Sequence, residues 1–131
     1  MTVVASDTDR IAPRVRRSFR ADDLEALGDL LHPDVPWGDH HHPDAGCQNR
    51  AEVLTWFRAR RGEGARAHMT EVVVHEDHVL IGVTVTGTDA QPGEAGGTPR
   101  WQVLTVEGGR IVDIRGYEDR ATAASAIGLP G

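Results

Sequence analysis

The sequence predicts one α+β domain in which helices come first and an antiparallel sheet follows. Apolar residues recur at helical spacing in the first third of the chain, four strand-like segments fill most of the remainder, and short turns separate neighbouring strands. A chain of 131 residues suits a single core, since single domains commonly have about 100–150 residues. We therefore treat residues 1–131 as one domain.

The first two helices follow from apolar spacing and from the residues that begin and end them. Ile11, Val15 and Phe19 recur every four residues, which places them on one face of a helix that begins near Ile11. Asp22 is a suitable N-cap for a second helix, and Pro33 ends it. The apolar side of this second helix carries Leu24, Leu27, Leu30 and Leu31.

A third helix is predicted to begin at Asn49, after a short extended segment that ends at Trp37. Asn49 and Glu52 have the spacing of a capping box, in which two side chains satisfy backbone N–H groups at the start of a helix. One face of this helix carries Val53, Trp56, Phe57 and Arg60. A last short helix, rich in alanine, is expected over residues 119–127.

Four segments have the apolar content and alternation of strands. They are His68–His75, Val79–Gly87, Arg100–Glu107 and Arg110–Tyr117. The links at 76–77 and 108–109 are short enough for hairpins, so neighbouring strands are expected to pair antiparallel. Residues 88–98 are rich in Gly, Pro and Ala and are expected to form an exposed loop.

Both faces of the predicted sheet carry apolar side chains. An antiparallel sheet with one face in water alternates more cleanly between polar and apolar residues. Helices can cover one face, so we expect a second subunit to cover the other. The two faces of the third strand are Trp101, Val103 and Thr105 on one side and Gln102, Leu104 and Val106 on the other.

Composition excludes several classes of protein. The formal net charge of -6 does not favour nucleic acid as a partner, and the arginine clusters at 14–20 and 58–61 are interpreted as solvated helix faces. The chain has no lysine and one cysteine, Cys47, which excludes a lysine Schiff base, an internal disulfide and a paired-cysteine zinc site. No apolar run reaches the roughly 20 residues that span a membrane, and the N-terminus lacks secretory features. We expect a cytoplasmic protein with no membrane partner.

Two stretches resemble a known family. The run DDLEAL at 22–27, followed by LHPDVPW at 31–37, resembles the opening of nuclear transport factor 2-like proteins of the SnoaL-like kind. The ending GRIVDIRGYEDR at 109–120 resembles their last strand, and the resemblance spans about residues 8–128. It implies a cystatin-like cone, in which a bent antiparallel sheet wraps around the N-terminal helices and encloses a pocket. The family includes steroid isomerase, polyketide cyclase, scytalone dehydratase, limonene epoxide hydrolase and proteins that only bind or associate.

The resemblance also implies roles for the two faces of the sheet. Members commonly form dimers through the outer face. The residues then expected to point into the pocket are Gln102, Leu104, Ile114 and Gly116. Those expected to face a partner subunit in a homodimer are Trp101, Val103, Arg115 and Tyr117.

Asp39 is the strongest catalytic candidate. It follows the strand that ends at Trp37, close to where steroid isomerase carries its proton-shuttling aspartate. A carboxylate beside Trp37 and Trp56 would be poorly solvated, which favours a general base, whereas an exposed loop aspartate is the plainer alternative. Gln102 matches the strand position of that enzyme's oxyanion hole and can donate a hydrogen bond. The first helix has no tyrosine and position 116 no acid, which disfavours steroid isomerisation and polyketide cyclisation.

An apolar pocket for a small hydrophobic molecule is expected behind the tryptophans. Its predicted walls are Trp37, His41, Trp56, Phe57, Leu104 and Ile114. The run His40–His42 contains metal-binding side chains, but consecutive residues do not aim at one point, so we predict no metal and no cofactor. The histidines are expected to cover the pocket mouth or to lie in water.

Two functions remain open at this point. One is a small-molecule-binding SnoaL-like protein that acts on a hydrophobic metabolite as a cofactor-independent isomerase, cyclase or dehydratase, with Asp39 as base and Gln102 as donor. The other is a non-enzymatic ligand-binding or dimeric association module built on the same scaffold. The fold alone does not decide between them.

Overall fold

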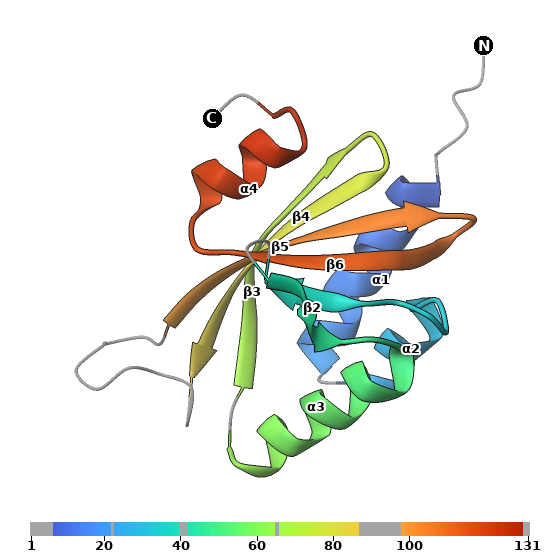
Figure 1. Ribbon diagram of the computed structural model, residues 1–131, viewed down its shortest axis with the longest axis vertical. Coiled ribbons are helices and arrows are strands. Elements are labelled where there is room, and N and C mark those ends of the chain that lie inside the picture. Colours follow the sequence, from blue (N-terminus) through green and yellow to red (C-terminus); the bar gives the residue numbers. More distant parts are fainter. Residues whose placement is uncertain (1–6, 22, 40–41, 65, 87–97, 130–131) are drawn as a thin grey trace.

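The computed structural model (Figure 1) describes residues 7–21, 23–39, 42–64, 66–86 and 98–129. It confirms the α+β class. In chain order the elements are α1 (Asp7–Ala21), α2 (Leu24–Leu30), β1 (Trp37–Asp39), β2 (His42–Cys47), α3 (Arg50–Gly62), β3 (Arg66–His75), β4 (His78–Thr86), β5 (Thr98–Glu107), β6 (Arg110–Tyr117) and α4 (Arg120–Ala126).

The helices begin close to where the sequence predicts, with two differences. α1 starts at Asp7, earlier than expected, because Thr8 is also buried and extends the contact of the helix with the core. Pro13 therefore lies inside α1 rather than in its first turn. The N-cap of α2 is Asp23, whose carboxylate accepts a hydrogen bond from the Ala26 amide at 3.1 Å. The predicted cap, Asp22, lies outside the described residues.

Six strands form one sheet in the order β2-β1-β6-β5-β4-β3. β3 to β6 form the predicted antiparallel meander, but β1 pairs with β6 in parallel, so the sheet is mixed. β2 was not predicted as a strand, since its sequence HPDAGC has no β-branched residue. Its pairing with β1 is close: a Cβ on Gly46 would overlap the Trp37 carbonyl.

The register of the strands sorts their side chains onto two faces. Trp37, Ile114 and Leu104 are successive partners across β1, β6 and β5 and point to the inner face, toward α1 and α3. Gly38, Arg115 and Val103 are partners in the next row, which points to the outer face. This is the division that alternation in the sequence predicts.

α4 covers part of the outer face, on the side of the sheet away from α1 (Figure 1). Val103 is only 4% exposed beneath Ala123 and Ala124, so its own chain covers a residue expected to face a partner subunit. Arg120 anchors α4 to β3 through two hydrogen bonds to the Glu71 carboxylate, at 2.8 and 3.0 Å. This pairing also lowers the pKa of Glu71 below its ordinary value.

Trp101 crosses the outer face over a glycine of the neighbouring strand. Gly82 on β4 is its register partner, and a Cβ at position 82 would overlap the Trp101 ring. The glycine therefore leaves the space that lets the indole pack against the sheet.

Replacing Gly82 with alanine is expected to destabilise the protein by about 1–3 kcal/mol, because the ring or the strand must move. Urea denaturation measures this loss. Gly62→Ala is the matched control: nothing lies within 4 Å of a Cβ there, and alanine near the end of α3 should leave stability unchanged or raise it by up to about 1 kcal/mol. Equal stability of the two variants would contradict this account of Trp101.

Candidate functional site

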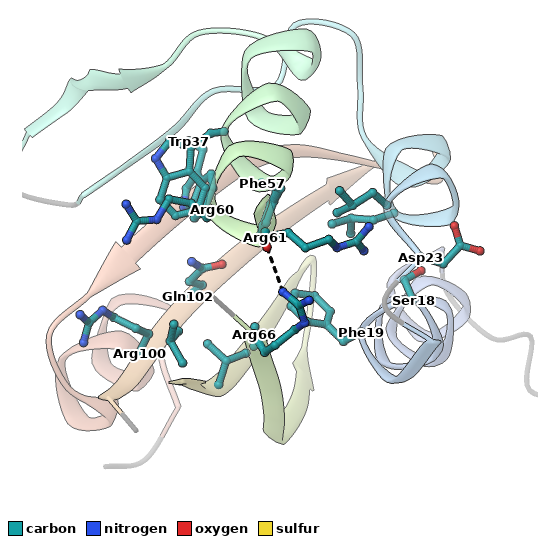
Figure 2. A pocket seen from close by; sticks show the side chains of 16 residues that line it. Ser18, Phe19, Asp23, Trp37, Phe57, Arg60, Arg61, Arg66, Arg100 and Gln102 are labelled. Carbon is teal, nitrogen blue, oxygen red and sulfur yellow. Dashed lines mark hydrogen bonds between the residues drawn. The ribbon is translucent and has the colours of Figure 1, made fainter. Parts of the chain in front are cut away.

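Two neighbouring hollows lie between α3 and the sheet. The inner cavity has a volume of about 180 Å³ and is enclosed by α1, α2, α3 and strands β1, β3, β4 and β5 (Figure 2). The outer groove is wider, at about 820 Å³, and runs between α3, β1 and β2 and the adjoining ends of β5 and β6. The two share Trp37, Trp56, Arg100 and Gln102 in their walls.

Three aromatic rings form the wall between the two hollows. Trp37 stacks on Phe57 with ring centroids 5.0 Å apart, and it meets Trp56 edge-on at 4.7 Å. The predicted pair of Asn49 and Glu52 holds the start of the helix that carries the two α3 rings. The Glu52 backbone N–H donates to Asn49 Oδ1 at 2.9 Å, and the side-chain Nδ2 of Asn49 donates to Glu52 Oε2 at 3.1 Å. Trp56 is 42% exposed, so part of its ring is left for a ligand to contact.

Leu104 and Ile114, predicted as pocket walls, lie deeper than expected. They are 3% and 5% exposed and line neither hollow. Instead they border a void of only about 10 Å³, too small for a ligand. The base of the cone is therefore solid core, and the open space lies nearer its mouth.

Asp39 and Gln102 lie in one row of the sheet with a glycine between them. Asp39 pairs with Gly116, and Gly116 pairs with Gln102, so the two polar residues are two strand spacings apart, roughly 10 Å. A Cβ at position 116 would meet nothing closer than 3.9 Å, which leaves the floor between them open. Both side chains line the outer groove.

The carboxylate of Asp39 is at the rim of the groove rather than behind the tryptophans. The residue is exposed, against the expectation of a poorly solvated acid. His41, predicted to lie at the same mouth, is outside the described residues.

Cys47 also lines the outer groove. Burial, and to a lesser extent the nearby Glu52 carboxylate, raises the pKa of its thiol. Because the thiolate is the reactive form, these surroundings make Cys47 a poor nucleophile and favour a packing role.

Sequence reasoning missed the arginines of the inner cavity. Arg60 and Arg61 follow Phe57 on α3, Arg66 begins β3 and Arg100 lies on β5, and all four line the cavity. The run 58–61 was interpreted as a solvated face, because helical spacing does not distinguish a face toward water from one toward a water-filled cavity. Arg66 Nη1 donates to the Arg61 carbonyl at 3.1 Å, which joins β3 to the end of α3 (Figure 2).

Within the described part of the chain, no group of three or more His, Cys, Asp or Glu side chains could hold a metal ion. No helix in the same residues is long and apolar enough to cross a membrane.

Comparison with known proteins places this architecture in a family. A family model described as SnoaL-like domain matches residues 14–114. The chain belongs to the SnoaL-like domain family. The match to the SnoaL-like domain begins within α1, ends within β6 and does not include α4. No curated protein matches the sequence.

Solved structures share the fold at low sequence identity. A candidate polyketide cyclase from Sinorhizobium meliloti is 22% identical with a TM-score of 0.64, over 86% of this chain and 100% of its own. A candidate ketosteroid isomerase from Kribbella flavida is 15% identical with a TM-score of 0.68, over 87% and 78%. TerC, co-crystallised with polyporic acid, is 19% identical with a TM-score of 0.63, over 93% and 98%.

Proposed function

We propose that this SnoaL-like protein binds a small hydrophobic molecule in the inner cavity and the adjoining outer groove. The observation that carries the proposal is the aromatic wall of Trp37, Trp56 and Phe57, which borders both hollows. Stacked and edge-on rings around a cavity favour a flat apolar ligand. The polyporic acid in TerC supports this choice, since that molecule occupies a protein of the same fold.

Binding of aromatic probes tests the proposal. In a panel of naphthalene derivatives that includes naphthalene-2-carboxamide, we expect saturable quenching of tryptophan fluorescence. Ala67 lines the inner cavity, and Ala67→Leu should weaken the affinity by about tenfold, since the larger side chain displaces apolar contacts worth on the order of 1.4 kcal/mol.

The control for this variant is Ala121→Leu, an exposed position on α4 outside both hollows, where affinity should not change. If the folded protein binds no member of the panel at millimolar concentration, or if both variants behave alike, the proposed cavity is not a binding site.

We further propose that the bound molecule exchanges a proton with Asp39 while Gln102 donates a hydrogen bond to the developing oxyanion. The observation in favour is the open row of Asp39, Gly116 and Gln102, along which a ligand can lie between base and donor. A carboxylate at this position can act as a general base toward an acidic C–H of the ligand. This chemistry needs no cofactor and suits isomerisation, cyclisation or dehydration.

A ketone with an acidic C–H serves as the probe. We expect the protein to accelerate deuterium incorporation into 2-tetralone in heavy water, followed by NMR, and Asp39→Asn to lower this rate by about a hundredfold or more. Asp34→Asn, an exposed aspartate outside both hollows, should keep the wild-type rate. An unchanged rate in Asp39→Asn would assign the proton transfer to another group.

The alternative, a module for self-association, rests on the outer face. Trp101 and Tyr117 pack beside the cluster under α4 and stay partly exposed, with Arg115 close by in the register. We propose this uncovered part as a homodimer interface, smaller than the whole face because α4 covers Val103.

Sedimentation tests the interface. The wild-type chain should sediment as a dimer, and Trp101→Glu should yield monomers, because a buried charge without a partner costs several kcal/mol. Thr70→Glu, at an exposed position on β3, controls for added charge. A wild-type monomer, or a dimer that survives Trp101→Glu, would remove the proposed interface.

A further inference from the structure

The walls of the inner cavity have the opposite charge to the protein as a whole. The formal net charge of the chain is -6, yet among the described residues the charged side chains that line the cavity are four arginines and one acid, Asp23. No lysine exists in the sequence, so every cation here is a planar guanidinium. Positive charge is thus concentrated where the proposed ligand would bind.

Arg66 and Arg100 are exposed and Arg60 and Arg61 are half-buried, so the arginines lie where the cavity meets solvent. In Figure 2, Arg60 and Arg100 lie on the side of Trp37, Arg61 and Arg66 lie nearer Phe19, and Gln102 lies between the two pairs. The remaining lining is mainly apolar. It has nine apolar residues, among them Phe19, Leu27 and Val85, beside Ser18 and Asp23.

Local contacts orient these guanidinium groups. Arg60 contacts Glu63 at 3.2 Å and lies over the Trp56 ring at 5.6 Å. Arg66 donates to the Arg61 carbonyl at 3.1 Å, and Arg100 Nη1 donates to the Pro99 carbonyl at 3.0 Å. A guanidinium has five N–H donors in a planar fork, and each of these two bonds uses one of them and orients its group.

The size of the cavity limits which part of a ligand enters it. A cavity of roughly 150 Å³ lined by apolar side chains accepts a molecule of benzene, so about 180 Å³ suits a single ring. Anything larger must extend past Trp37 and Gln102 into the outer groove, or end at the arginines.

We infer that the ligand is a hydrophobic carboxylate, whose ring enters the inner cavity and whose carboxylate group remains at the mouth beside Arg66 or Arg100. This inference rests on the proposed function, because it specifies the class of molecule that the same cavity binds. The guanidinium fork matches the planar geometry of a carboxylate. Arg66 and Arg100 are both exposed, so a carboxylate can reach them from solvent while its ring contacts the apolar walls.

A matched pair of probes isolates the charge. 2-Naphthoate and naphthalene-2-carboxamide have the same ring and nearly the same shape, but only the first is an anion at neutral pH. We expect isothermal titration calorimetry to give an affinity at least about tenfold higher for the naphthoate, as a charge-assisted hydrogen bond contributes. Added NaCl should reduce this preference, since salt screens exposed charges.

Substitution of single arginines tests whether the preference for the naphthoate arises in the inner cavity. Arg66→Gln and Arg100→Gln, separately and together, should reduce the ratio of naphthoate to carboxamide affinity, and the double variant should bring it close to one. Arg58→Gln is the control, since Arg58 is exposed on α3 and lines neither hollow. Circular dichroism melts check that Arg66→Gln folds. If Arg66→Gln does not fold, two measurements still test the inference. They are the salt dependence of the wild type and the ratio of naphthoate to carboxamide affinity in Arg100→Gln.

The outcomes separate this inference from the proposed function. Equal affinities for the two probes would overturn the carboxylate preference while the binding cavity stands. A preference that Arg58→Gln reduces as much as Arg100→Gln would also overturn it, because the charge would then act from the surface at large. If neither probe binds the folded protein, the proposed function and the inference fail together.

Discussion

The site depends on the attachment of one short segment to the last strand. The chain from Leu31 to Asp39 runs beside β6, and the His32 amide donates to the Ile111 carbonyl at 2.8 Å while the Ile114 amide donates to the Pro36 carbonyl at 3.0 Å. These bonds set the parallel register of β1. A shift of one residue would turn Trp37 to the outer face and Asp39 away from the row of Gln102. The parallel register of β1 therefore positions both the aromatic wall and the Asp39 carboxylate.

The second support of the site is the helix that faces this segment. α3 is held at its start by the reciprocal bonds of Asn49 and Glu52, and at its end by the bond from Arg66 to the Arg61 carbonyl. Between these ends, Phe57 stacks on Trp37. The aromatic wall is thus contributed by two elements that are each fixed by backbone or capping bonds, which sets where the rings lie.

Sequence patterns within each segment predicted the helices and most strands well. How deeply a side chain is buried depended instead on pairing between strands that are distant in the sequence. Caps and apolar spacing placed α2 and α3 within a residue or two, and alternation sorted Leu104 and Val103 onto the correct faces. The alternation of apolar and polar residues predicts which face of the sheet a side chain occupies, but not how deeply it is buried. Leu104 was therefore expected to line the cavity, whereas it lies in the core. The strand β2 exists because β1 offers it an edge, and its own residues carry little β propensity. The arginines of the inner cavity were not predicted as cavity residues, because α3 and the strands that complete the cavity wall are distant from one another in the sequence.

Because arginine is the only basic residue at the cavity, its charge affects how ligand binding depends on pH. Guanidinium groups stay protonated throughout the pH range in which proteins remain folded, so the entrance beside Arg66 and Arg100 keeps its sign from acid to alkaline conditions. The ionisation of the incoming molecule then contributes to any change in ligand capture across that range. In acid, a weak organic acid would lose its attraction to these guanidinium groups by taking up a proton.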